Sequence, residues 1–215
     1  MNQKTSEQLQ KALGFLNLQY QSFSLAAPFA TATGHPVPCD SRGWSQILVS
    51  VLTGLKGLAR KKGPDFSDGS DVKAANAWEA IDVPRFNGVV KAGTKAATAG
   101  KLQSLDKVPY LFLVLWDHAP VTNRPRCRIW CVRPQSDKAF RAMCKKWYDQ
   151  VANREIKSNN FQLHPPIGKD SNVSTNRCGN LSYPLLLLAE YIDDRFVSVQ
   201  YEPEVLKSGE CSVSA

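Results

Sequence analysis

The sequence predicts a mixed α/β protein with a central β-sheet flanked by helices, and three observations lead to that prediction. Pro109–Trp116 is a continuous apolar run, typical of a strand buried on both faces. Between Thr5 and Phe23, apolar residues recur at intervals of four, three and four, which marks one face of a helix. The chain has 215 residues, of which 43% are hydrophobic and 21% charged, and this composition suits one packed domain.

The N-terminal elements follow from the same periodicity. A helix is expected over about Thr5–Phe23, and the Pro-, Gly- and Thr-rich stretch Ala26–Arg42 is expected to be a loop. A second amphipathic helix is predicted over about Ser41–Lys61. The turn signal Asp68-Gly69 predicts a β-hairpin within Gly63–Ala75.

The later elements are expected to complete the sheet and its cover. Arg126–Arg133 alternates polar and apolar residues, which predicts a half-buried strand with Arg126 and Arg128 facing outward. Ser136 is expected to cap a helix that runs to about Ala152. The predicted C-terminal part has an irregular polar stretch, a short helix and a strand, at Asn159–Asn180, from Pro184 and at Val197–Tyr201. Within one domain, 1–215, we divide the chain into an N-terminal helical part (1–62), a core (63–157) and a loop-rich end (158–215).

Charge is distributed unevenly along the chain. The net charge is +8, and Arg124–Lys146 holds eight bases and one acid, whereas Leu185–Ala215 holds six acids and two bases. A focused positive surface concentrates a polyanion, and nucleic acid is the usual one, although a basic surface can also serve solubility alone. The first residues lack the apolar core of a signal peptide, no apolar run is long enough to span a membrane, and the six cysteines lack zinc-site spacing; we therefore expect a cytoplasmic protein with reduced thiols.

One segment of this basic region carries two acids and a lysine. Asp71 and Lys73 stand two residues apart, so in a strand their side chains share a face, and a three-residue turn would bring Asp65 to the same face. Two carboxylates, with the carbonyl of Val72, would offer Mg²⁺ the hard oxygen ligands it prefers. The metal would acidify a bound water, and Lys73 could orient that water or stabilise charge on a phosphate. Taken alone, the segment could equally be an ordinary solvated turn.

The segment also resembles a known family. The Pro-Asp…Asp-x-Lys form of Gly63–Lys73 is similar to the PD-(D/E)XK nuclease superfamily, which includes most type II restriction endonucleases. Two segments, Lys62–Asn76 and Trp78–Gly88, resemble the MamI-type restriction enzymes more closely. Phe161–Pro166 and Asn176–Pro184 also resemble restriction enzymes, and the resemblance covers about Leu55 to Pro184.

The resemblance implies a fold, an activity and partners. It implies a mixed sheet flanked by helices, a homodimer, and Mg²⁺-dependent cleavage of both strands of DNA, with a cognate methyltransferase acting on the same site without stable binding. Asp65 and Asp71 would hold the metal and Lys73 would be the catalytic lysine. Only five residues separate Asp65 from Asp71, where many members have ten or more, so Asp68 and Glu79 remain alternatives to Asp65.

Sequence recognition would then depend on polar side chains outside this centre. Amide side chains suit adenine and arginine suits guanine, whereas lysines hold phosphates. The candidate DNA contacts are Arg85, Asn87, Lys91, Lys95, Asn172, Asn176 and Arg177. Two alternatives remain for the function: a repair or junction-resolving nuclease of the same superfamily, and a nucleic-acid-binding protein without catalysis.

Overall fold

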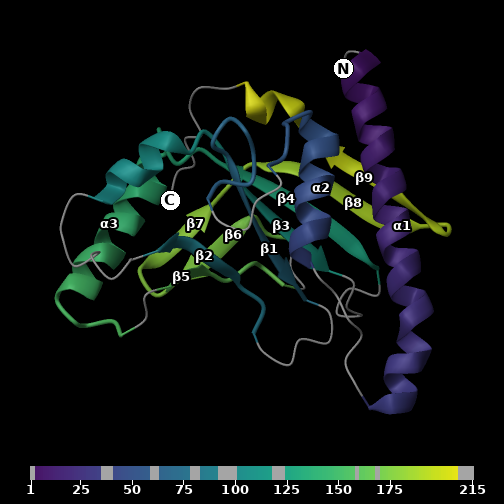
Figure 1. Ribbon diagram of the computed structural model, residues 1–215, viewed down its shortest axis with the longest axis horizontal. Coiled ribbons are helices and arrows are strands. Elements are labelled where there is room, and N and C mark those ends of the chain that lie inside the picture. The colour runs from purple at the N-terminus through teal and green to yellow at the C-terminus, as the bar shows by residue number, and fades with distance from the viewer. Residues whose placement is uncertain are drawn as a thin grey trace.

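A mixed five-stranded sheet forms the centre of the protein. The computed structural model describes residues 3–34, 41–58, 63–77, 83–91, 101–117, 124–157, 160–167 and 170–207. The sheet has the order β1-β3-β4-β8-β9, in which β1 pairs parallel with β3 and the other neighbours pair antiparallel (Figure 1). Its strands are β1 (Asp71–Asn76), β3 (Leu111–Asp117), β4 (Arg126–Val132), β8 (Leu185–Ile192) and β9 (Arg195–Tyr201). The predicted fold class is confirmed.

Helices and two small sheets cover the central sheet on opposite faces. Helices α1 (Gln3–Thr33) and α2 (Ser41–Thr53) pack on one face, and α3 (Lys138–Ala152) lies on the other side (Figure 1). The two-stranded sheets pair β2 (Phe86–Lys91) with β5 (Asn160–Leu163) and β6 (Val173–Asn176) with β7 (Gly179–Ser182). Two 3-10 helices, η1 (Lys101–Lys107) and η3 (Pro203–Leu206), complete the described elements. None of the described helices is both long and apolar enough to cross a membrane.

Strand β3 shows why the apolar run of the sequence predicts a central strand. All seven of its residues are buried. Leu111, Leu113 and Leu115 pack into the core on the α3 side, whereas Phe112 and Trp116 pack into the core beneath α1 and α2. Because successive side chains point to opposite faces, a strand between two cores must be apolar throughout.

The boundaries of the first two helices differ from those expected. α1 continues through Pro28 to Thr33, so the prediction of a loop from Ala26 is wrong at its start, and residues 35–40 lie outside the described part. α2 ends at Thr53 rather than Lys61, because Gly54 adopts φ +78°, the left-handed conformation that terminates a helix.

The prediction of a β-hairpin at 63–75 is wrong. Strand β1 begins only at Asp71, and its partner is the distant β3. The preceding residues form a compact loop in which the N–H groups of Asp65 and Phe66 both donate to the Ser70 carbonyl, at 3.2 and 3.1 Å. The turn at Asp68-Gly69 therefore closes this loop and does not connect two paired strands.

Strand β4 corrects the prediction of a half-buried strand. All seven of its residues are buried, and Arg126 and Arg128 are each only 3% exposed. Arg126 Nε donates to Asp117 Oδ2 at 2.9 Å, and the Arg128 guanidinium lies 3.5 Å from the same oxygen. Both arginines can be buried because they pair with a buried carboxylate. The alternation of polar and apolar residues alone does not reveal this partner.

Three further predictions differ from the structure. The N-cap of α3 is Asp137 rather than Ser136, and its carboxylate accepts from the Phe140 N–H at 2.9 Å. The stretch expected to be irregular, Asn159–Asn180, contains β5 and β6. The apolar run after Pro184 is β8, a strand in the sheet, rather than a helix. The strand expected at Val197–Tyr201 is confirmed as β9.

Candidate active site

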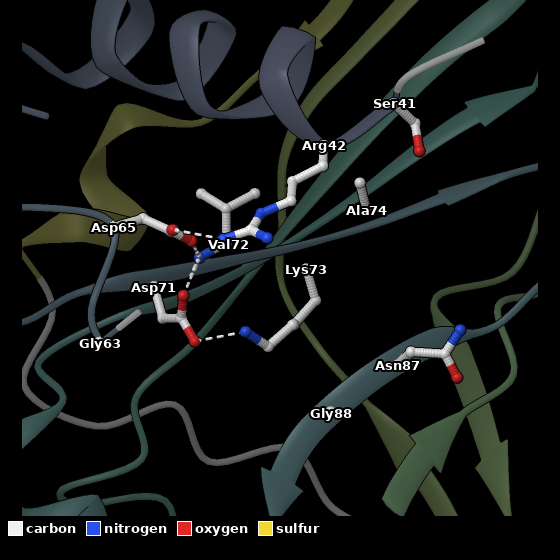
Figure 2. A pocket seen from close by; sticks show the side chains of 10 residues that line it. All are labelled: Ser41, Arg42, Gly63, Asp65, Asp71, Val72, Lys73, Ala74, Asn87 and Gly88. Atoms are coloured by element: carbon white, nitrogen blue, oxygen red, sulfur yellow. Dashed lines mark hydrogen bonds and ion pairs between the residues drawn. The ribbon is translucent and has the colours of Figure 1, made fainter. Parts of the chain in front are cut away.

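A pocket of about 550 Å³ opens beside the edge strand β1. Its lining includes Arg42 from α2, Asp65 from the loop, Asp71 and Lys73 from β1, and Asn87 from β2 (Figure 2). Within the described residues, this pocket gathers the two acids and the lysine that the sequence analysis singled out. The element that carries Asp65 differs from the expected one, because Asp65 lies on a loop and not on a strand paired with β1.

Asp71 and Lys73 are held by strand geometry. They stand two positions apart in β1, so their side chains share a face, and Lys73 Nζ donates to Asp71 Oδ2 at 2.5 Å (Figure 2). Their side chains are 23% and 19% exposed, so both are partly shielded from water yet reachable from the pocket.

The Asp65 side chain is held by two elements, β1 and α2. Asp65 is 8% exposed, and its Oδ2 accepts from the backbone N–H of Val72 at 2.9 Å. Its Oδ1 accepts from Gln46 Nε2 of α2 at 2.5 Å and lies 3.8 Å from the Arg42 guanidinium. Phe66 anchors the loop by burying its ring against Phe112. A buried carboxylate with this many donors is tightly oriented.

The loop that carries Asp65 is tightly closed. Gly69 has φ +97°, and a Cβ there would lie 2.5 Å from the Lys107 carbonyl oxygen, so only glycine fits. Asp68 accepts from the N–H and the hydroxyl of Ser70, both at 2.9 Å. Asp68, an alternative first acid, is thus engaged in the loop and does not line the pocket. Glu79, the other alternative, lies outside the described residues.

The two carboxyl groups have opposite pKa shifts. Burial and the hydrogen bond with Asp65 raise the pKa of Asp71 to about 6, against the opposing charge of Lys73. Burial also acts to raise the pKa of Asp65, but hydrogen bonds from Asp71 and Val72 and the charges of Lys73 and Arg42 outweigh it and lower that pKa. The pair therefore retains one proton, on Asp71, to higher pH than an isolated carboxyl would.

This donor set suits one type of cation. Among the described residues, no three His, Cys, Asp or Glu side chains gather as a metal cage. Mg²⁺ does not need such a cage, because it keeps several waters and is commonly bound through one or two carboxylates and a substrate phosphate. A divalent cation would also displace the proton that the two acids share. The residues present therefore fit Mg²⁺.

The predicted DNA contacts occupy different surroundings. Asn87 is exposed and lines the pocket, and Arg85 is partly buried immediately before β2. Lys91 ends β2, but its side chain and all of Lys95 lie outside the described part. These positions leave Asn87 as the predicted contact that shares the pocket with the acids.

The remaining predicted contacts lie on or beside the β6–β7 hairpin. Asn172 Oδ1 accepts from Trp130 Nε1 at 2.9 Å, and Asn176 bonds the Gln162 carbonyl and the Cys178 N–H, so both amides hold the fold. Arg177 is exposed in the turn between these strands.

Sequence reasoning missed Arg42 and Gln46. They stand four residues apart on α2, so they share a helix face, which is distinct from the face that buries Leu48 and Leu52. The sequence does contain one indication of their role: two polar residues at this spacing near the start of an amphipathic helix. Nothing local indicated that this face would meet Asp65.

An Asp-x-Lys strand with a second carboxylate beside it, on a mixed sheet between helices, is the arrangement of the PD-(D/E)XK class of proteins.

Comparison with known proteins gives a narrower assignment. The chain belongs to the MamI restriction endonuclease family, whose model matches residues 28–192. It is 31% identical over 186 residues to the type II restriction enzyme MamI of Microbacterium ammoniaphilum. That match covers 81% of this chain and 59% of the relative, so the chain spans somewhat more than half the length of that enzyme. No solved structure matches the chain significantly.

Proposed function

We propose that this protein is a type II restriction endonuclease that hydrolyses phosphodiester bonds in double-stranded DNA at a specific sequence, with Mg²⁺ as its cofactor. The observation that carries the proposal is the convergence of Asp65, Asp71 and Lys73 in one pocket. Family membership supports it, since the relative is a type II restriction enzyme.

In the proposed mechanism, Asp65 and Asp71 would hold Mg²⁺, and the Val72 carbonyl would be a further ligand. The Val72 N–H donates to Asp65 at 2.9 Å, away from β3. Because the N–H and C=O of one strand residue point to the same edge, the Val72 carbonyl is on the Asp65 side as well. Bound Mg²⁺ would lower the pKa of a water and neutralise charge on the scissile phosphate.

Lys73 acts directly on the reacting groups. Its ammonium, beside Asp71, orients the attacking water and stabilises the negative charge that develops on the phosphate oxygens. Water attacks the phosphorus in line and gives up a proton to solvent, the bond from phosphorus to the 3′ oxygen breaks, and that oxygen takes up a proton from solvent, which gives 5′-phosphate and 3′-hydroxyl ends. Arg42, 64% exposed at the pocket, contacts a neighbouring phosphate.

Cleavage of both strands requires a second centre. The two DNA strands run antiparallel, so two copies related by a two-fold axis would present equivalent sites to them. We therefore propose a homodimer in the cytoplasm, together with a methyltransferase that modifies the same sequence without stable binding to this protein. The inference about the dimer rests on the single candidate centre among the described residues.

The test is cleavage of phage DNA by purified protein in Mg²⁺ and in EDTA, read on a gel. The expected result is discrete fragments only with Mg²⁺ and no cleavage by Asp71→Ala. Asp149→Ala is the matched control, because Asp149 is a half-exposed acid paired with Lys145 on the surface of α3. A Mg²⁺-dependent smear would indicate a repair or junction-resolving nuclease, and DNA binding without any cleavage would indicate a binding protein.

A further inference from the structure

Three amide side chains meet on the β2–β5 sheet. Asn87 Oδ1 accepts from Gln162 Nε2 at 2.7 Å and from Asn160 Nδ2 at 3.3 Å. Asn160 is fixed in turn, since its Oδ1 accepts from the Gly88 N–H at 2.6 Å. Hydrogen bonds from two strands therefore hold these side chains in one orientation, which lowers the entropy cost of a further contact.

This amide cluster lies at the border of the candidate active site. Asn87 and Gly88 line the pocket that also contains Asp71 and Lys73, and Figure 2 shows Asn87 on β2, across the pocket from Asp65. Asn87 is exposed, and Gln162 is partly exposed. A duplex with a phosphate beside Lys73 would therefore pass next to the amides.

Within the described part of the chain, the cluster leaves one donor group and one acceptor available. Among the described residues, the Nδ2 group of Asn87 and the Oε1 atom of Gln162 have no hydrogen-bond partner, while the opposite ends of both amides bond each other. The two groups belong to side chains that are hydrogen-bonded to each other, so they offer a donor and an acceptor side by side at the border of the pocket.

This pairing matches one base edge. In the major groove, adenine presents N7 as an acceptor beside the N6 amino donor, whereas guanine presents two acceptors. Guanine would place O6 against Gln162 Oε1, two acceptors with no hydrogen between them. We propose that Asn87 and Gln162 form a specificity-determining pair that reads adenine, with Asn87 Nδ2 donating to N7 and Gln162 Oε1 accepting from N6. The proposal rests on the proposed function, because it assumes duplex DNA in the pocket.

The experiment separates binding from cleavage. Wild-type protein with Ca²⁺ in place of Mg²⁺ selects its preferred sequences from a pool of random duplexes. Each constant adenine is then replaced singly by purine, which lacks the N6 amino group, or by 7-deazaadenine, which lacks N7. Binding of these duplexes is measured for wild type, Asn87→Ala, Gln162→Ala and the control Gln200→Ala, an exposed amide on the distant edge strand β9.

At one adenine of each half-site, we expect guanine to weaken wild-type binding about 5- to 150-fold. There, purine and 7-deazaadenine should each weaken it about 3- to 10-fold. Gln162→Ala should bind adenine and purine equally at that position, and Asn87→Ala should bind adenine and 7-deazaadenine equally. Gln200→Ala should discriminate as wild type does, and unchanged melting temperatures should confirm that the variants fold.

Two results would overturn the inference: selected sequences without a constant adenine, or variants that keep the wild-type preference at every adenine. Uniform weakening across all bases would also contradict it, because that pattern belongs to phosphate contacts. If wild type cuts with Mg²⁺ and the variants keep their discrimination, the inference fails and the proposed function stands. If the pair reads adenine but Mg²⁺ never produces cleavage, the proposed function fails and the readout stands.

Discussion

Two clusters of opposite charges lie at β-strands of the same sheet, and they are built differently. At the pocket, Asp65 and Asp71 face the nearby cations Lys73 and, at 3.8 Å, Arg42. Further along the sheet, the fully buried Asp117 faces both Arg126 and Arg128. The first cluster opens on a cavity, whereas the Asp117, Arg126 and Arg128 side chains of the second, here called the sealed cluster, are each at most 3% exposed.

The two clusters differ in the sign of the charges that lie close together: two acids in the pocket cluster and two arginines in the sealed cluster. In the pocket cluster, burial and the neighbouring acid raise the pKa of Asp71 to about 6. In the sealed cluster, burial and the neighbouring arginine lower the pKa of Arg128 to about 10, so both arginines stay charged at neutral pH. Crowded acids beside an open pocket are suited to a cation. The two buried arginines are balanced by the buried Asp117 and the exposed Asp170, and this arrangement serves the fold.

Breaking the sealed cluster should have the largest effect. Asp117→Ala would leave two buried arginines without their shared carboxylate, and we expect a loss of about 3–5 kcal/mol in the free energy of unfolding. Chemical denaturation measures this. Asp170→Ala is the matched control, because Asp170 pairs with Arg126 from a side chain that is 95% exposed, and it should cost below about 1 kcal/mol. Equal losses for the two variants would contradict the distinction.

Breaking the pocket cluster should instead remove activity while the fold remains. Lys73→Ala should lower kcat about 100- to 1,000-fold, because a charge aimed at the transition state is lost. Its melting temperature should stay near that of wild type. Single-turnover cleavage with saturating Mg²⁺ measures the rate, and Lys145→Ala on the surface of α3 is the control. Full activity of Lys73→Ala would exclude this residue from the chemistry.

Because Asp65 and Asp71 lie close together, the free energy of unfolding of the metal-free protein should depend on pH. A folded-state pKa of Asp71 raised from 3.8 to about 6 gives stability that is complete below pH 3.8 and is lost as pH rises through 6. Asp71→Asn should therefore match wild type near pH 4 and be more stable by about 1–2 kcal/mol at pH 8 in EDTA. The full shift would give about 3 kcal/mol, and the shared proton with Asp65 reduces it.

Melting curves across this pH range measure that effect. Added Mg²⁺ should reverse the difference at pH 8, since wild type alone keeps both ligands. A variant that is less stable than wild type at pH 8 in EDTA would show that the acids are not crowded in the free protein.

The smallest effect concerns the orientation of Asp65. Gln46→Ala removes the donor 2.5 Å from Asp65 Oδ1, and we expect the Mg²⁺ concentration for half-maximal cleavage to rise about 10-fold. The rate at saturating Mg²⁺ should change little, which separates a positioning residue from a catalytic one. Ile47→Ala, at the exposed neighbouring position on α2, is the control. An unchanged Mg²⁺ requirement would show that the other contacts of Asp65 orient it sufficiently.

The sequence revealed those features that depend on local pattern. The alternation of a strand is enough to bring Asp71 and Lys73 to one face, and an unbroken apolar run is enough to identify β3. The apolar run of β8 predicts a helix wrongly, because length and composition alone do not separate a buried strand from a buried helix.

Features that depend on distant partners escaped prediction. Asp71 begins a strand whose partner lies forty residues onward at Leu111, so the nearby turn signal suggested the wrong pairing. Arg126 and Arg128 look outward-facing until Asp117 is known to lie opposite Arg126 and within 3.5 Å of the Arg128 guanidinium. In both cases, tertiary contacts override the local pattern.

The short closed loop between Asp65 and Asp71 limits how such a site can diverge. One end enters β1, the middle is fixed by Gly69 against Lys107, and Phe66 is buried. One inserted residue adds up to about 3.5 Å of chain, more than the hydrogen bonds around Asp65 can absorb. Over evolution, the separation of the two acids would therefore change by replacement of the whole loop together with its contacts, rather than by gradual lengthening.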